Sequence, residues 1–163
     1  MSEITWIEVD LNAIEHNLKA IKSMVGSGTK ILAIVKADAY GHGAARVAHT
    51  LEQNGADMLG VAFPGEGIEL RKNNINIPIL ILNPVLSEQI EDVIQHSLGV
   101  TVNSLDIANE ISVTAKKHHS NIRIHVEIDT GMGGAGVCPD NALPFIKELL
   151  LIENLEIEGV FTH

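Results

Sequence analysis

A lysine at the end of an apolar run is the residue of this chain with the most evident covalent chemistry. Lys36 follows the run Ile31–Val35 and precedes a segment punctuated by glycines. The run predicts a buried strand, so the Lys36 amine should lie at the edge of a low-dielectric interior. Burial there disfavours the charged form and lowers the pKa, as a Schiff-base lysine requires. The alternative is a lysine that extends from a strand end into solvent.

Helical and strand patterns alternate along the whole chain. Strands are predicted at 29–36, 58–63, 77–82, 98–102, 122–129 and 155–162. A helix that Asp10 can cap precedes them, and helical patterns separate them at 43–54, 65–73, 87–96, 104–118 and 140–151, with Ser87 and Ser104 as candidate N-caps. The strands read as continuous apolar runs, which is typical of parallel sheets. This βα repeat predicts an α/β fold, either a (β/α)8 barrel or a doubly wound sheet.

Polar residues fall at or just beyond the carboxyl ends of five of the six predicted strands. They are Lys36, Asn83, Asn103, Asp129, Thr130, Thr162 and His163. In α/β folds the carboxyl edge of the sheet is where ligands bind, because the loops converge there. We therefore expect these side chains to surround a ligand site.

Four segments resemble the signatures of alanine racemases, in the family's order. They are Trp6–Leu18, the lysine loop Lys36-Ala-Asp-Ala-Tyr-Gly-His-Gly43, the glycine-rich Asp129–Gly133, and Gly159–His163. The resemblance implies a TIM-like barrel followed by a β-rich second domain. Six strands do not close an eight-stranded barrel. We therefore expect residues 1–163 to be the amino-terminal barrel domain, truncated after strand six, with the carboxy-terminal domain absent.

The resemblance also implies the chemistry. Lys36 would carry pyridoxal phosphate and act as the base for D-alanine, Tyr40 would lie near the cofactor phosphate, and His163 would pack on the cofactor ring. The reaction would interconvert L- and D-alanine. The family's opposite base is a tyrosine from the second domain of a partner subunit, which implies a homodimer. Tyr40 is the single tyrosine of this sequence, so we expect the fragment itself to be inactive.

Two positions depart from the family pattern. Gly134 stands where the family places an arginine that binds the cofactor's phenolic oxygen, and Glu127 stands where many members place a carbamylated lysine. A carboxylate can imitate the negative carbamate, but the arginine that it would orient is missing. The departures place substrate affinity and turnover in question even for a full-length protein.

Two alternatives remain open. A non-catalytic protein that binds or carries pyridoxal phosphate would suit the loss of the arginine. The run Gly131–Gly136 also satisfies the G-x-G-x-x-G pattern of a dinucleotide-binding βαβ unit, with Glu156 or Glu158 as the ribose acid. Pro139 delays the following helix, which weakens this second alternative.

Composition sets the remaining limits. The chain has 163 residues, is 45% hydrophobic and carries a net charge of −10, which argues against nucleic acid or anionic membranes as partners. Cys138 is the single cysteine and fits a reducing compartment. The eight histidines show no metal-ligand spacing. No secretory signal or membrane-spanning run is visible, so we expect a cytoplasmic protein.

Overall fold

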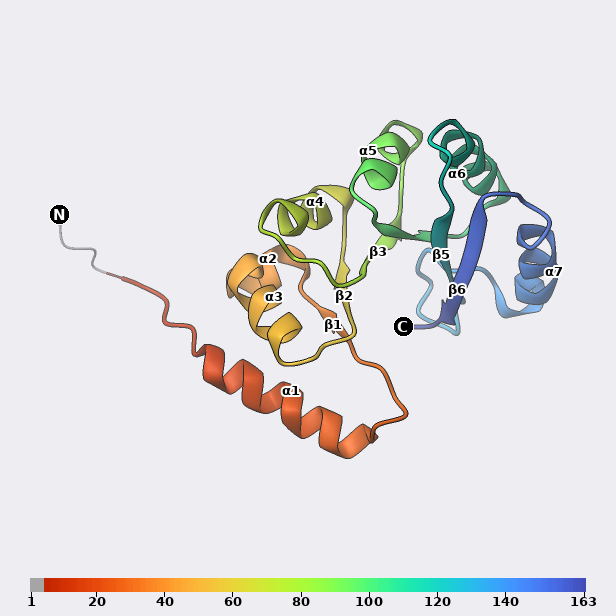
Figure 1. Cartoon of the computed structure of the whole chain (residues 1–163). Helices are drawn as coiled ribbons and strands as arrows, with labels where there is room; N and C mark the ends of the chain where they lie inside the picture. Colours follow the sequence, from red (N-terminus) through yellow and green to blue (C-terminus); the bar gives the residue numbers. More distant parts are fainter. Residues whose placement is uncertain (1–4) are drawn as a thin grey trace.

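The computed structural model describes residues 5–163. Residues 1–4, on which the prediction of no secretory signal partly rests, lie outside the described residues. The described strands form one six-stranded sheet in which neighbours along the chain are neighbours in space, and every pair is parallel (Figure 1). The strands are β1 (Leu32–Ile34), β2 (Met58–Val61), β3 (Ile79–Pro84), β4 (Gly99–Val102), β5 (Ile122–Glu127) and β6 (Leu155–Phe161). The sheet confirms the predicted partial (β/α)8 architecture.

Helices occupy the connections between the strands. They are α1 (Leu11–Val25), α2 (Lys36–Gly41), α3 (Ala44–Gln53), α4 (Pro64–Lys72), the 3₁₀-helix η1 (Ser87–Gln89), α5 (Ile90–Gln95), α6 (Leu105–Lys117) and α7 (Pro139–Leu149). Within residues 5–163, no helix is long and apolar enough to cross a membrane.

Two of the three predicted helix caps are confirmed. The Asp10 carboxylate accepts the amide N–H of Asn12 at 2.9 Å, and Ser104 Oγ accepts that of Ile107 at 3.3 Å. The prediction for Ser87 is wrong, because Ser87 is already the first residue of η1 and Leu86 occupies the capping position. The Gln89 side chain, rather than a serine hydroxyl, accepts the Leu86 N–H at 2.9 Å.

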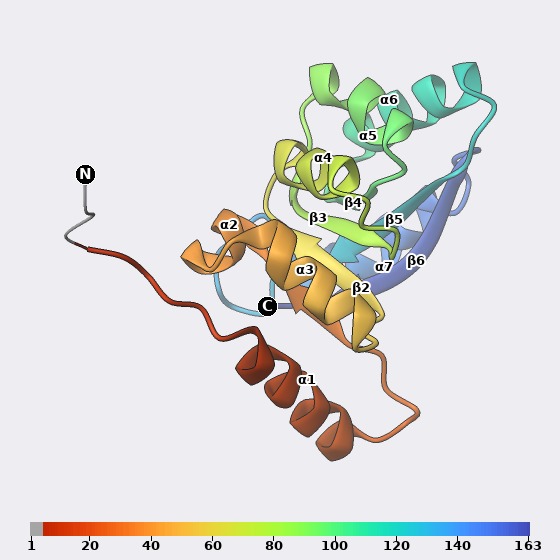
Figure 2. The ribbon, with the colours of Figure 1, turned by 60° about the vertical axis from the view of Figure 1, so that its left-hand side comes forward.

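The sheet has a helix-covered outer face and an inner face. Outer-face side chains come from alternate strand positions and are at most 1% exposed: Leu59, Val61, Ile79, Ile81, Val100, Val102, Ile124 and Val126. Figure 2 shows α3 to α6 on this side of the curved sheet. On the inner face, Gly60 leaves room for its neighbours, because a Cβ there would lie 2.6 Å from Ile34 Cδ1.

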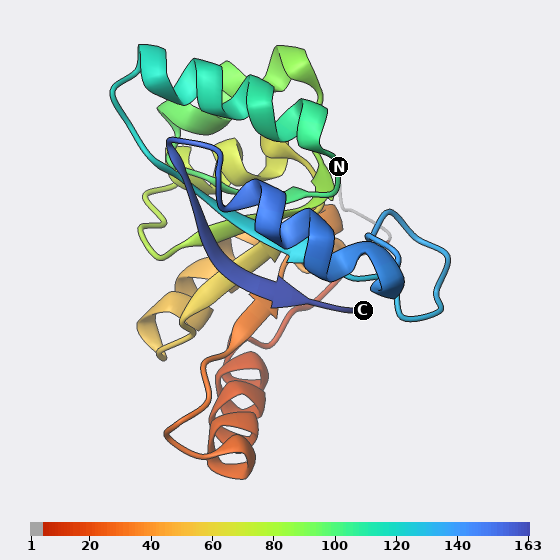
Figure 3. The same ribbon diagram turned by 90° about the vertical axis from the view of Figure 1, so that its right-hand side faces the viewer.

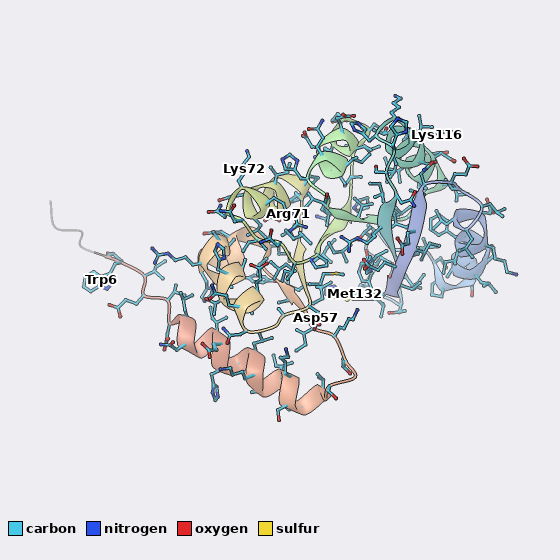
Figure 4. The ribbon with its side chains drawn as sticks, in the orientation of Figure 1. Trp6, Asp57, Arg71, Lys72, Lys116 and Met132 are labelled. Carbon is cyan, nitrogen blue, oxygen red and sulfur yellow. The ribbon has the colours of Figure 1, made fainter. Side chains whose placement is uncertain are left out.

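An arginine joins several loops between the helices and the amino ends of the strands. The Arg71 guanidinium donates to backbone carbonyls before β3 and before β4 (Figure 4), namely those of Ile75, Ile77, His96 and Ser97, at 2.8–3.2 Å. This edge is therefore tied together by internal hydrogen bonds. In α/β barrels the amino edge serves stability and the carboxyl edge serves function.

Candidate active site

Lys36 lies at the carboxyl end of β1, as the sequence predicts. The Val35 amide still pairs with the Gly60 carbonyl at 2.8 Å, and Lys36 then begins α2. Its side chain is partly buried, and its amine enters none of the hydrogen bonds or ion pairs formed within residues 5–163. A partly buried amine with no internal partner is available to a carbonyl compound.

The residues after Lys36 do not form an ordinary helix. Ala37–Tyr40, which we call the lysine turn, have φ values of 51–55° and are left-handed. This geometry costs about 1–2 kcal/mol for each L-residue that adopts it. Hydrogen bonds from the following residues compensate: the Gly43 amide donates to the Asp38 carbonyl at 3.0 Å, and the Ala44 amide to the Asp38 carboxylate at 2.6 Å. The turn is thus a fixed, strained element, of the kind that clusters at functional sites.

A carboxylate from a neighbouring helix anchors the lysine turn. Glu66 Oε1 accepts the Ala37 amide N–H at 2.6 Å, directly beside Lys36. Glu66 Oε2 accepts the amides of Ala62 at 2.6 Å and Phe63 at 3.1 Å, which precede α4. Our sequence reasoning missed Glu66. The available signal was a glutamate at the third position of a helix that begins with proline, where its side chain can cap the helix.

The other candidates of the lysine loop face solvent. The Tyr40 side chain is 60% exposed, so its hydroxyl is accessible to a ligand at this edge. His42 Nδ1 lies 2.9 Å from the Ala39 carbonyl, which engages this ring in holding the turn.

A second loop at the same edge folds on itself. We call residues 129–137 the glycine loop. The Asp129 carboxylate accepts the amides of Gly131 at 2.9 Å and Gly133 at 3.1 Å, and these bonds hold the pKa of the Asp129 carboxyl below its usual range. The Val137 carbonyl accepts the Asp129 amide at 2.9 Å. Gly136 permits this close approach, because a Cβ there would lie 2.6 Å from the Asp129 nitrogen.

These contacts count against a dinucleotide site. The amides of Gly131 and Gly133 already donate to Asp129, so a pyrophosphate would have to displace an internal carboxylate. Glu158, one candidate ribose acid, lies 3.2 Å from the His125 ring instead. The glycines of this pattern instead allow the loop to fold back onto the Asp129 carboxylate.

Of the two departures from the racemase pattern, Glu127 lies just before the glycine loop and Gly134 lies within it. Glu127 is the last residue of β5 and is partly buried. A Cβ at Gly134 would meet nothing within 4 Å, and its φ is not in the left-handed region. The backbone at position 134 can therefore accept a long side chain without strain. Met132, at the tip of the loop, is 70% exposed (Figure 4).

The end of β6 joins the same edge. The Thr162 hydroxyl lies 2.7 Å from that of Thr130, and the Ile128 amide donates to the Phe161 carbonyl at 2.8 Å. His163 follows directly and is exposed, and Figure 3 shows this end of the chain just beyond the β6 arrow. The parallel sheet thus gathers the predicted polar residues at one edge. Within residues 5–163, no hydrogen bond or ion pair connects Lys36, Tyr40 and His163 to one another.

Known proteins match almost the entire chain. The model of the alanine racemase N-terminal domain matches residues 9–163. The alanine racemase of Halothermothrix orenii is 41% identical over 98% of this chain and 42% of its own length. That of Methanococcus maripaludis is 40% identical over 100% of this chain and 44% of its own length. The chain therefore spans less than half the length of these relatives.

Solved structures show the same relationship. Alanine racemase from Clostridium difficile 630, in a complex with cycloserine, is 41% identical and superposes with a TM-score of 0.95 over 100% of this chain and 45% of its own. The Bacillus anthracis enzyme with bound L-Ala-P is 36% identical, with a TM-score of 0.89 over 100% of this chain and 42% of its own. The parallel βα fold, the order of the motifs and these relatives lead to one conclusion: the chain belongs to the alanine racemase family and corresponds to its N-terminal domain.

Proposed function

We propose that the protein containing this chain interconverts L- and D-alanine with pyridoxal phosphate as its cofactor. The observation that carries the proposal is the Lys36 amine, which has no internal partner within residues 5–163 and lies at the carboxyl end of β1, next to a strained and anchored turn. The family relationship supplies the reaction class. Pyridoxal phosphate, when bound through a lysine, serves as an electron sink for the carbanion left by α-proton removal.

The residues at this edge fit such a cofactor. Lys36 would attach it covalently, the exposed Tyr40 hydroxyl would bind its phosphate, and His163 would pack against its ring. Lys36 follows Val35, which is only 1% exposed, so the attachment point would lie at the border of the packed core. The exposure of Tyr40 and His163 leaves both side chains accessible to a ligand.

Lys36 would also move the proton. In the D-to-L direction its free amine would take the α-proton from D-alanine, and in the L-to-D direction it would give a proton to that same face after the opposite base has removed one from L-alanine. Glu66 would keep the amine in place by holding the Ala37 amide. The family relationship implies a tyrosine of a partner subunit in a homodimer as the base for the opposite face. Tyr40, the only tyrosine of this sequence, belongs to the lysine turn.

A second candidate function is a protein that holds the cofactor without turnover. Gly134 favours it, because no side chain at this position can bind the cofactor's phenolic oxygen. The two candidates share the attachment at Lys36 and differ in catalysis. Conversion of L-alanine to D-alanine by the full-length protein would establish the racemase, and cofactor binding without conversion would establish the carrier.

The attachment itself can be tested by chemical trapping. The full-length protein is loaded with pyridoxal phosphate, reduced with borohydride, digested and analysed by mass spectrometry. We expect the pyridoxyl group on the peptide containing Lys36, and we expect Lys36→Ala to lose it. Lys30→Ala is the matched control, because Lys30 lies just before the same strand but at its opposite end. An adduct on another lysine would contradict the assignment.

The 163-residue chain alone offers a further test of the two-base scheme. Without a partner's tyrosine it should not racemise alanine, because a positioned general base typically contributes ~10²–10⁴-fold. The measurement is L- to D-alanine conversion with added pyridoxal phosphate. Conversion that disappears in Lys36→Ala would mean that the second base lies within these residues.

A further inference from the structure

The pairing of β5 with β6 changes register in the middle of β6. Ile124 pairs with Ile157, and the next residue, His125, pairs with Gly159. Glu158 is therefore an extra residue on β6. One inserted residue of this kind, a β-bulge, exchanges the two faces of the strand for every residue that follows it.

This bulge decides which face of the sheet His163 occupies. Before it, Ile157 lies opposite Ile124, which is fully buried on the outer face. Unbroken alternation would carry His163 onto that same outer face. After the bulge, the Phe161 ring lies on the same face as the His125 ring. The two ring centroids are 6.4 Å apart in an edge-to-face arrangement. β6 ends at Phe161, and continuing its alternation by two residues puts His163 on the inner face.

The inner faces of the first and last strands look toward each other across the barrel interior. A cavity of about 280 Å³ is lined by Leu32 and Met58 from β1 and β2, and by His125 and Glu158 from β5 and β6. A side chain on the inner face of β6 therefore points toward the space that β1 borders. The cavity also touches Lys30 and Asp57, which precede β1 and β2, so it lies toward the amino edge of the interior, and Lys36 follows β1 at the opposite, carboxyl edge.

Three residues hold the bulge in place. Glu158 Oε2 lies 3.2 Å from His125 Nε2, and Glu158 Oε1 lies 3.7 Å from Arg123 Nη1. The His125 side chain is only 12% exposed, whereas the Glu158 side chain that it contacts is 33% exposed. Gly159 leaves room for this ring, because a Cβ there would lie 2.8 Å from His125 Nδ1. A larger residue at 159 would push the imidazole away from Glu158.

We propose that His125 and Glu158 are positioning residues: by fixing the bulge in β6, they turn His163 into the barrel interior, toward the ring of the cofactor. This inference rests on the proposed function, because His163 has a ring to contact only when pyridoxal phosphate is attached at Lys36. Neither His125 nor Glu158 touches the cofactor in this scheme. They act through the direction of β6, which ends at Phe161, two residues before His163.

The test is a double-mutant cycle in the full-length protein. We expect Glu158→Ala and His163→Ala each to weaken binding of pyridoxal phosphate about two- to tenfold, the range of an aromatic contact. Both should change the visible circular dichroism of the bound cofactor in the same way. The double variant should bind no more weakly than His163→Ala alone, because Glu158 acts through His163.

Two further variants separate positioning from general damage to the fold. Glu158→Gln keeps a hydrogen-bond acceptor for His125 and should restore most of the binding. Glu156→Ala removes the same charge from the same strand before the bulge, and should bind the cofactor as the wild type does. No ion pair within residues 5–163 involves Glu156. If Glu158→Ala does not fold, Gly159→Ala with and without His163→Ala provides the same cycle.

The outcomes distinguish this inference from the function on which it rests. Additive effects in the cycle, or wild-type binding by Glu158→Ala, would overturn the positioning role while borohydride labelling of Lys36 leaves the proposed function intact. Absence of labelling at Lys36 in the wild type would overturn both.

Discussion

The two loops at the carboxyl edge of the sheet are stabilised in different ways. The lysine turn adopts a left-handed backbone in four residues that are not glycine, and its first amide depends on Glu66 from α4. The glycine loop uses an acceptor of its own, Asp129, and places glycines where φ is positive, at 131 and 133. Lys36 is therefore coupled to the packing of the barrel. The glycine loop supplies its own acceptor for the amides of Gly131 and Gly133, and its outside contacts fall at Thr130 and Ala135. Position 134 can therefore change without disturbing the fold.

Removing the external anchor should have the largest effect. Glu66→Ala deletes the acceptor of three backbone amides, and hydrogen bonds to a charged group contribute about 1.5–3 kcal/mol. We expect the free energy of unfolding to fall by about 2–3 kcal/mol in urea denaturation, together with weaker attachment of the cofactor at Lys36. Glu69→Ala, an exposed carboxylate on the same helix, is the control and should stay within about 0.5 kcal/mol. Equal effects would show that the turn does not depend on α4.

Two glycines test whether the glycine loop is self-contained. A methyl group at Gly136 would meet backbone atoms of residues 127–129 at 2.6–3.1 Å, and backbone cannot move aside cheaply. Gly136→Ala should therefore destabilise the domain by about 1–3 kcal/mol. Gly134→Ala should be nearly neutral, since nothing lies within 4 Å of its added carbon. Thermal unfolding of the two variants gives the comparison, and identical Tm values would contradict it.

Local patterns were sufficient to predict most of the fold. The apolar runs and the spacing between them predicted six parallel strands, and polar residues at their carboxyl ends marked the edge that the sheet then brought together. Asp10 and Ser104 could be predicted as caps because a helix cap involves only neighbouring residues. The prediction of Ser87 as a helix cap was wrong, because the side chain of Gln89, two residues further on, accepts the backbone amide at the start of the helix.

The parts that could not be predicted depend on contacts between distant residues. Nothing in the propensities of Ala37–Tyr40 indicates a left-handed turn, because its strain is offset by Glu66, 29 positions beyond Ala37. The bulge at Glu158 likewise depends on the His125 ring of another strand. Register is set by pairing across the sheet, so sequence alternation alone would have placed His163 on the opposite face.

Gly134, which stands where the family places an arginine, predicts a gain of function. Gly134→Arg introduces a guanidinium where the backbone is unstrained and the space open. A charge-assisted hydrogen bond is worth about 1.5–3 kcal/mol, so we expect kcat/KM for alanine to rise on the order of tenfold to a hundredfold in the full-length protein. Glu127 would orient the new side chain.

A neighbouring glycine provides the control for that gain. Gly133→Arg adds the same charge one residue earlier, at a φ of 72° that strains any L-residue, and should not raise activity. If Gly134→Arg leaves kcat/KM unchanged, the racemase would have to function without this contact.

The smallest expected effect is the response of the glycine loop to acid. Backbone amides hold the pKa of Asp129 below its usual range, so its folded-state pKa is lower than its unfolded one. The stabilisation is therefore complete above the unfolded pKa and is lost as pH falls through the folded value. Asp129→Asn should be less stable than the wild type at neutral pH, and this gap should narrow below about pH 4.

The same titration can be followed at single amides by NMR. The Gly131 and Gly133 N–H signals should shift as Asp129 gains its proton, because both donate to that carboxylate. The Ala135 amide does not contribute to the shifted pKa and serves as the internal control. A stability gap that persists unchanged in acid would mean that the asparagine alters the loop through its shape rather than its charge. The glycine loop would then share with the lysine turn a dependence on packing, and the contrast between the two loops would fail.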